Sequence, residues 1–307
     1  NSEHNSVEFS SIGEFETVKI SAYHNRGITD LLEKVLEDSK NISSDTENIK
    51  LSIVGHPNVG KSSIFNLLTE SNRSIVSDIP GTTRDSIDYV ANYGENKIKF
   101  IDTAGLKKRG QIDPGIDKYS TIRTIKSIEN ADVCILIINS EEMITAQDLH
   151  ISGFIKDLMR PCIIVLNKID LLDKYEAESL IKKIKEKFSH IPDIPVILTS
   201  ATKVINIDKI VPEAITVYEN SIRRINQKEL NKCFINAITN KQPPSKGKKT
   251  PELFSISQYK VGPPGFKFES SNYDLIHFSY KRYLENNIRQ SFDFSGCPIS
   301  LRFVKGK

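Results

Sequence analysis

The sequence predicts an α/β domain with a doubly wound, mostly parallel sheet, followed by a small α+β domain. A first apolar run at 49–54 is followed by β-branched runs at 97–101, 133–139, 162–166 and 196–198. Segments of helical spacing separate these runs, at 117–129, 147–158 and 174–188. Strands that alternate with helices favour a parallel sheet covered on both faces. We therefore expect one doubly wound domain over residues 49–218.

The pattern changes after Tyr218. A predicted helix at 222–239 is followed by strand-like runs at 252–261 and 265–269, a helix at 280–289 and a closing strand at 298–304. This order predicts a small α+β domain over residues 219–307, which is large enough to fold alone. Gly262-Pro-Pro-Gly265 lies between two strand-like runs, so we interpret it as a strand connection.

The first residues repeat a later part of the chain. Val18–Ala22, Gly27 and Ile28 align with Leu198–Ala201, Asn206 and Ile207 at a constant offset, and both copies read strand, Ser-Ala, loop, helix. We expect residues 1–36 to be the tail of an earlier domain of the same kind. Residues 37–48 are polar and aperiodic, which predicts a flexible linker. The start lacks Met and an apolar signal region, which favours the middle of a longer reading frame.

Composition excludes several classes of protein. With 38% hydrophobic residues the chain can bury a core, and no run approaches the ~20 apolar residues of a membrane span. The four cysteines are widely spaced, and two of them lie inside Val/Ile runs, where a buried thiol is expected; this favours a reducing compartment. Residues 221–307 carry 16 Lys and Arg against 6 Asp and Glu, whereas residues 1–220 carry 26 against 33. A basic end on an acidic body indicates either a polyanionic partner or a solvated lysine-rich surface.

A glycine-rich loop directly follows the strand at 49–54 and opens a helix. Its pattern, Gly-x-x-x-x-Gly-Lys-Ser, is typical of a loop whose backbone N–H groups surround a phosphate. Lys61 can reach the β and γ phosphates, and the Ser62 hydroxyl can ligate Mg²⁺. The predicted nucleotide contacts in this segment are Gly55, His56, Pro57, Asn58, Val59, Gly60, Lys61, Ser62 and Ser63.

A second motif, Asn167-Lys168-Ile169-Asp170, follows the strand at 162–166. The Asp170 carboxylate can accept two hydrogen bonds from the Watson–Crick edge of guanine, and Asn167 can address its O6 and N7 side. Adenine lacks this pair of donors. Ser200 and Ala201 end the next strand, where their backbone can support the base. These residues predict a guanine pocket.

Two further segments complete the order of elements that a GTPase requires. Asp102-Thr103-Ala104-Gly105 follows the strand at 97–101, and Pro80–Arg84 contains Thr83. Asp102 is placed to hold Mg²⁺ through water, and Thr83 is a second candidate Mg²⁺ ligand. The Gly105 N–H can contact the γ phosphate and turn when that phosphate leaves. We therefore expect the domain to bind GTP and GDP.

With these motifs the chain resembles the Era-like GTPases, and more narrowly the Der (EngA) family, which has tandem G domains and a KH-like C-terminal domain. The segment Leu275–Asn286 and the remnant of a preceding G domain carry the narrower resemblance, which covers essentially the whole chain. It departs from the family in lacking the first domain's phosphate loop and guanine motif.

The resemblance implies Mg²⁺-dependent GTP hydrolysis, with Lys61, Thr83 and Gly105 as the catalytic residues. Leu106 stands where Ras-like enzymes place the glutamine that orients water, so a different arrangement is expected. In related GTPases an asparagine at the position of Asn58 helps to bind K⁺; alternatively, Asn58 only shapes the turn. Lys107–Arg109 is either a solvated basic run or a contact for RNA or a neighbouring domain.

The family further implies a cytoplasmic assembly factor of the large ribosomal subunit that contacts rRNA. The compartment could equally be the stroma of a bacterial-derived organelle. We expect a monomer without a membrane or DNA partner, in which GTP repositions the C-terminal domain. The phosphate contacts predicted there are Lys246, Lys248, Lys249, Lys281, Arg282, Arg289, Arg302 and Lys305. Two alternatives are a tRNA-modification GTPase and an RNA-binding module with an inert G domain.

Overall fold

The computed structural model describes residues 20–21, 48–70, 88–103, 117–142, 144–245 and 249–306. Asn48–Lys307 forms one compact unit. The predicted remnant at 1–36 and linker at 37–48 therefore lie almost wholly outside the described residues. The predicted division of the compact unit after residue 218 stays a prediction.

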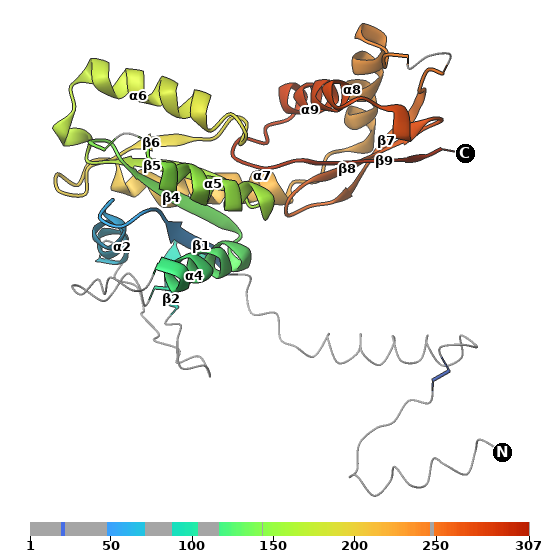
Figure 1. Cartoon of the computed structure of the whole chain (residues 1–307). Coiled ribbons are helices and arrows are strands. Elements are labelled where there is room, and N and C mark those ends of the chain that lie inside the picture. Colours follow the sequence, from blue (N-terminus) through green and yellow to red (C-terminus); the bar gives the residue numbers. More distant parts are fainter. Residues whose placement is uncertain are drawn as a thin grey trace, which may run out of the picture. The chain divides into compact units, whose positions relative to one another are not determined.

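A six-stranded sheet of order β2-β3-β1-β4-β5-β6 forms the centre of the first half (Figure 1). Its strands are β1 (Ile49–Val54), β2 (Tyr89–Tyr93), β3 (Asn96–Phe100), β4 (Val133–Asn139), β5 (Cys162–Asn167) and β6 (Val196–Leu198). Only the β2–β3 pair is antiparallel among these strands; the other four pairs are parallel. The predicted mostly parallel sheet is confirmed, and β2 is an edge strand that the sequence analysis missed.

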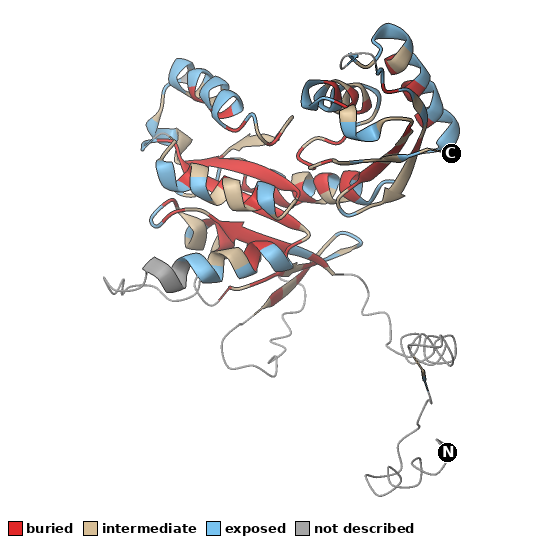
Figure 2. Ribbon diagram, turned by 45° about the vertical axis from the view of Figure 1, so that its right-hand side comes forward, coloured by how far each residue is buried: buried red, intermediate tan, exposed pale blue. Residues whose placement is uncertain are grey.

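Helices cover both faces of this sheet. Side chains of β4 alternate, with Ile135 and Ile137 in one apolar cluster and Cys134 and Leu136 in the other. The first cluster includes residues of α2 (Lys61–Glu70) and α7 (Ile210–Ile222), and the second includes residues of α4 (Asp117–Asn130), α5 (Ala146–Asp157) and α6 (Lys174–Lys187). The strands are consequently buried while the outer helix surfaces are exposed (Figure 2). Strands buried on both faces explain the continuous Val/Ile runs.

The second half is a three-stranded sheet, β7-β8-β9, packed against two helices. The strands are β7 (Leu253–Lys260), β8 (Gly265–Ser270) and β9 (Ser300–Lys305), and the helices are α8 (Gln227–Asn240) and α9 (Phe278–Ser291). The predicted start of α8 at residue 222 is wrong, because α7 runs to Ile222 and the Asn226 side chain caps α8 by accepting from the Lys228 N–H at 2.9 Å. Gly262–Gly265 connects β7 to β8, as predicted.

All four cysteines are free and buried. This confirms the predicted burial of the two in the Val/Ile runs, Cys134 and Cys162, and adds Cys233 and Cys297. Burial raises the pKa of the Cys134 and Cys297 thiols to about 12, so both stay protonated. Among the helices that the structure describes, none has the length and apolar character that crossing a bilayer requires.

Candidate nucleotide site

The predicted phosphate loop lies between β1 and α2, at the carboxyl edge of the sheet. Val59 is fully buried and His56 is 7% exposed, whereas Pro57 and Asn58 are exposed. Val59 and His56 therefore anchor the loop while its tip remains open. Ser62 is half-buried in the first turn of α2, and the neighbouring Ser63 is exposed.

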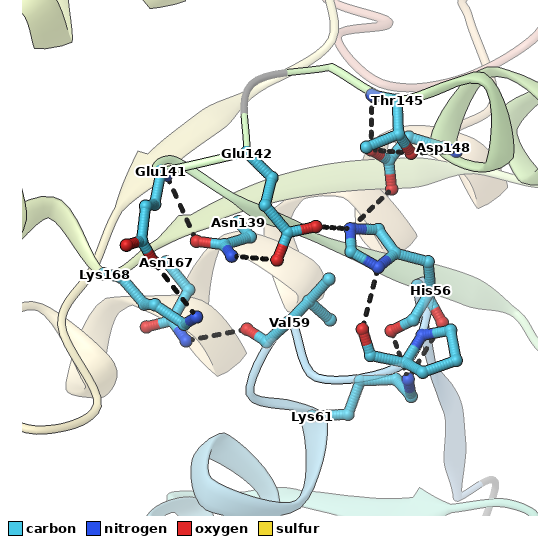
Figure 3. Close-up of polar contacts among 12 residues, drawn as sticks. His56, Val59, Lys61, Asn139, Glu141, Glu142, Thr145, Asp148, Asn167 and Lys168 are labelled. Atoms are coloured by element: carbon cyan, nitrogen blue, oxygen red, sulfur yellow. Dashed lines mark hydrogen bonds and ion pairs between the residues drawn. The ribbon is translucent and has the colours of Figure 1, made fainter.

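Lys61 folds back over the loop that precedes it. Its Nζ donates to the carbonyl of His56 at 2.7 Å and to that of Gly55 at 2.9 Å (Figure 3). Burial lowers the pKa of Lys61 to about 8, and the negative charge of Asp148 partly opposes this shift. The loop thus holds a partly buried ammonium group, which phosphate oxygens would stabilise in its charged form.

Asn167 joins the phosphate loop to the predicted guanine pocket. Its Nδ2 donates to the Val59 carbonyl at 2.9 Å, and its Oδ1 accepts from the Ala201 N–H at 3.1 Å. Gly60 lies directly against this amide at φ +100°, where an added Cβ would come within 2.2 Å of Nδ2. The predicted contact of Asn167 with guanine stays a prediction. The structure adds a buried connection that the motif alone did not reveal.

Asp170 and Ser200 face one another beside this connection. The Ser200 hydroxyl donates to Asp170 Oδ1 and accepts from the Lys203 N–H at 3.0 Å. The backbone of Ser200 also pairs with Ile205, which closes the loop after β6. Lys168 has a left-handed backbone at φ +67°, and its Nζ lies 3.7 Å from Glu141 Oε2. The Asn-Lys-x-Asp and Ser-Ala segments are therefore brought together, as the guanine-pocket hypothesis requires.

Asp102 ends up beside a cation that the sequence analysis did not consider. Arg123 of α4 donates from Nε to both Asp102 carboxylate oxygens, at 2.6 and 2.9 Å. The Asp102 N–H donates to Asp88 at 3.2 Å, and the adjacent Thr103 is fully buried. The remaining predicted site residues, Thr83, Ala104, Gly105 and Leu106, lie outside the described residues, as does the basic run at 107–109.

The sequence analysis also missed a polar cluster behind the loop. Asn139 at the end of β4 donates to Glu142 at 2.7 Å, and Asp148 in the first turn of α5 is fully buried. Thr145 and Asp148 form a reciprocal capping box at the start of α5. The Thr-x-x-Asp spacing could have located this helix start, but nothing in it indicates that His56 lies beside the carboxylate.

One of the phosphate contacts predicted in the C-terminal domain is wrong. Arg289, predicted to contact phosphates, has a side chain only 6% exposed, which pairs with Glu285 and donates to the carbonyls of Phe294 and Cys297. It is a structural residue because three internal acceptors hold it. Lys281 and Arg282 are exposed, as predicted.

The two tyrosines of α9 are core or core-edge residues, as the sequence analysis expected. Tyr280 is 1% exposed and Tyr283 is half-buried. Their hydroxyls donate to the backbone carbonyls of Lys241 and Ala237, at 2.6 and 2.8 Å. The two rings therefore hold α9 against α8 and are not free to stack on a base.

Together the sheet, the glycine-rich loop and the two strand-end segments define a phosphate-loop GTPase domain, followed by a KH-like domain. Residues 50–168 match the family model described as 50S ribosome-binding GTPase. Residues 224–303 match the C-terminal KH-domain-like region of EngA bacterial GTPase enzymes.

The chain belongs to the GTPase Der family. It is 39% identical to GTPase Der of Clostridium acetobutylicum over 310 residues, which cover 99% of this chain and 71% of that protein. It is 38% identical to GTPase Der of Finegoldia magna, over 99% of this chain and 70% of that protein. A crystal structure of Aquifex aeolicus Era bound to GDP and AlF₄⁻ shares 25% identity, covers 83% of this chain and 91% of that one, and has a TM-score of 0.43. As a member of this family the chain is a GTPase that uses GTP, GDP and Mg²⁺.

Proposed function

We propose that the guanine nucleotide lies along the carboxyl edge of the six-stranded sheet, from the loop at 55–60 to the segments at 167–170 and 200–201. The Asn167 side chain carries this proposal, because one buried amide fixes the phosphate loop and the base segments relative to each other. Backbone N–H groups of the loop and Lys61 bind the phosphates. Asp170 accepts from the guanine edge, and Ser200 orients its carboxylate.

The donor set fits a magnesium ion in chemical type. The Ser62 hydroxyl lies in the first turn of α2, and Asp102 lies just after the neighbouring strand β3. Hydroxyl, carboxylate and phosphate oxygens are the ligands that Mg²⁺ prefers. We assign Ser62 and Thr83 as Mg²⁺ ligands. Asp102 contacts the ion through a water molecule. Asp102 is paired with Arg123 in the structure, so this pairing must break before Asp102 can contact the Mg²⁺ water.

Hydrolysis is the step for which this chain's residues provide charge and orientation. Lys61 stabilises negative charge that develops on the phosphates, Thr83 contributes as a second Mg²⁺ ligand, and Gly105 donates its N–H to the γ phosphate. Leu106 has no polar group to orient water. We further propose that K⁺ binds beside Asn58, whose exposed side chain and left-handed backbone at φ +66° leave it at the open tip of the loop.

We propose that the protein acts on the large ribosomal subunit in the cytoplasm, as a monomer that contacts rRNA through phosphates. Two observations support this proposal: the match to a ribosome-binding GTPase model and the excess of basic residues after residue 220. Of the predicted contacts, Lys249, Lys281, Arg282, Arg302 and Lys305 are exposed, and Arg289 is withdrawn. Lys246 and Lys248 lie outside the described residues.

The test is co-sedimentation of the protein with separated ribosomal subunits, in a GTP analogue and in GDP, across a salt series. We expect binding to the large subunit that weakens steeply with salt, because phosphate contacts release counterions. Lys281→Glu with Arg282→Glu should weaken binding. The control pair, Lys182→Glu with Lys183→Glu, reverses two adjacent exposed lysines on α6 and should not. Binding that responds to neither salt nor the α9 pair would refute the rRNA contact.

A further inference from the structure

His56 is the one phosphate-loop side chain that points into a cluster of carboxylates among the described residues (Figure 3). Its Nδ1 lies 2.8 Å from the Pro57 carbonyl. Because a carbonyl can only accept, Nδ1 donates this hydrogen bond. Nε2 therefore faces away from the loop, 3.6 Å from Glu142 Oε2 and 3.9 Å from Asp148 Oδ1.

Two atoms of this cluster are buried without a hydrogen-bond partner in the part of the chain that the structure describes: His56 Nε2 and Asp148 Oδ1. The other Asp148 oxygen, Oδ2, accepts from the N–H and the hydroxyl of Thr145, at 3.0 and 2.8 Å. Helix capping thus satisfies Oδ2 of this fully buried carboxylate and leaves Oδ1 without a hydrogen bond. Buried polar atoms in this state are costly unless another group compensates them. Among the described residues, the imidazole Nε2 lies 3.9 Å from Asp148 Oδ1, and the Lys61 ammonium group interacts favourably with the Asp148 charge from the other side of the loop backbone.

Glu142 is held in place from the sheet. Its Oε1 accepts from Asn139 Nδ2 at 2.7 Å, and Asn139 is fully buried at the end of β4. Asn139 also pairs in register with Asn167 of β5, the residue that holds Val59. The carboxylate that faces His56 is therefore fixed to the same two strand ends that support the opposite end of the phosphate loop.

We propose that Glu142 and Asp148 are positioning residues that act through His56 to hold the first turn of the phosphate loop. Because Nδ1 already donates to Pro57, the contact requires a further proton held between Nε2 and the facing carboxylate oxygens. The backbone at 55–57 contributes the carbonyls of Gly55 and His56 that hold Lys61, so its orientation decides where the ammonium group and the loop N–H groups point. This inference rests on the proposed function, because it requires phosphates at this loop. It adds two residues from outside the nucleotide motifs.

The negative charge of the two carboxylates and their proposed role in positioning the loop predict opposite effects on GDP binding. Two carboxylates behind a phosphate site repel an anion, so removing one of their charges should tighten GDP binding if charge alone mattered. If the carboxylate positions the loop, its removal should weaken GDP binding and leave guanosine binding unchanged, since guanosine has no phosphates. The ratio of the two affinities isolates the loop from the base pocket and from general loss of folding.

The experiment measures GDP and guanosine affinities of the full chain by competition with a fluorescent GDP. Glu142→Gln is the test variant, because the side chain is 47% exposed and its neutralisation should not unfold the protein. We expect about five-fold weaker GDP binding, the size of one modest polar contact, with guanosine unchanged. In a His56→Ala background, which should itself weaken GDP binding, the Glu142 change should have no further effect. The matched control Glu141→Gln faces Lys168 and should leave the affinity ratio unchanged.

Unchanged or tighter GDP binding by Glu142→Gln would overturn this inference alone. An equal loss of GDP and guanosine binding would overturn it as well, since the side chain would then support the fold in general. Failure of the unaltered protein to bind GDP would overturn the proposed function and this inference together.

Discussion

Replacement of Asn167 by alanine tests whether this side chain connects the two ends of the nucleotide site. The side chain is 1% exposed and satisfies the Val59 carbonyl and the Ala201 N–H. Leaving a buried backbone group unpaired costs about 1–3 kcal/mol, so the two groups together predict a loss of about 2–6 kcal/mol in the free energy of unfolding. That is a large part of the ~5–15 kcal/mol by which domains are stable.

The assay is urea unfolding of the nucleotide-free protein, followed by GDP titration of the variant. Asp170→Asn is the matched control, because it alters the same motif but its carboxylate contacts only the Ser200 hydroxyl among the described groups. We expect Asn167→Ala to lose stability before any nucleotide is added, and the control to lose little. A variant as stable as the unaltered protein that binds GDP weakly would refute the connecting role and leave only a contact with the base.

Asp170→Asn should lose GTP affinity and gain affinity for XTP, because the amide matches the donor and acceptor pattern of xanthine. Competition binding with both nucleotides measures this, and unchanged GTP affinity would show that the base does not bind at Asp170. Since burial lowers the pKa of Lys61 to about 8 and phosphates favour its charged form, GDP affinity should fall as the pH rises above about 8. GDP titrations from pH 7 to about 9.5 measure this, and a GDP affinity that does not change with pH would refute it. GTP turnover should be faster in K⁺ than in Na⁺, and Asn58→Ala should abolish the difference; equal rates would remove the ion from the mechanism. Arg123→Gln should lower the Mg²⁺ concentration needed for half-maximal turnover, because Asp102 loses its competing partner; an unchanged Mg²⁺ titration would contradict that competition.

The parallel sheet and the nucleotide motifs could be predicted because their signals are local. A strand buried on both faces must be continuously apolar, as Ile135–Ile138 is, and a phosphate loop needs glycines at fixed spacing. β2 escaped detection because Tyr89–Tyr93 is short and buried at only two positions. Its pairing with β3 depends on a neighbour and not on its own composition.

The polar partners could not be predicted, since each is chosen by contacts between distant segments. Asp148 reads as a helix cap, which it is, and only the fold shows that His56 lies against its second oxygen. Arg289 reads as a basic surface residue, yet the loop at 294–297 supplies carbonyls that draw it inward. The sequence identifies the residue types that can pair, and the tertiary structure selects the pairs.

The same strand that ends at the nucleotide site begins at the C-terminal domain. The Cys162 N–H, at the start of β5, donates to the Gly296 carbonyl at 2.8 Å, and the Gly296 N–H donates to the Asp193 carbonyl at 3.1 Å. Gly296 has φ +68°, and an added Cβ would come within 2.6 Å of the Cys162 carbonyl oxygen, so only glycine fits this approach. Because β5 continues from there to Asn167, the KH-like domain is attached to the rigid element that supports the guanine pocket. These contacts favour a C-terminal domain that moves with the sheet, and they argue against the expectation that GTP repositions it. A nucleotide-dependent affinity for RNA would then have to arise at the surface beside the bound phosphates.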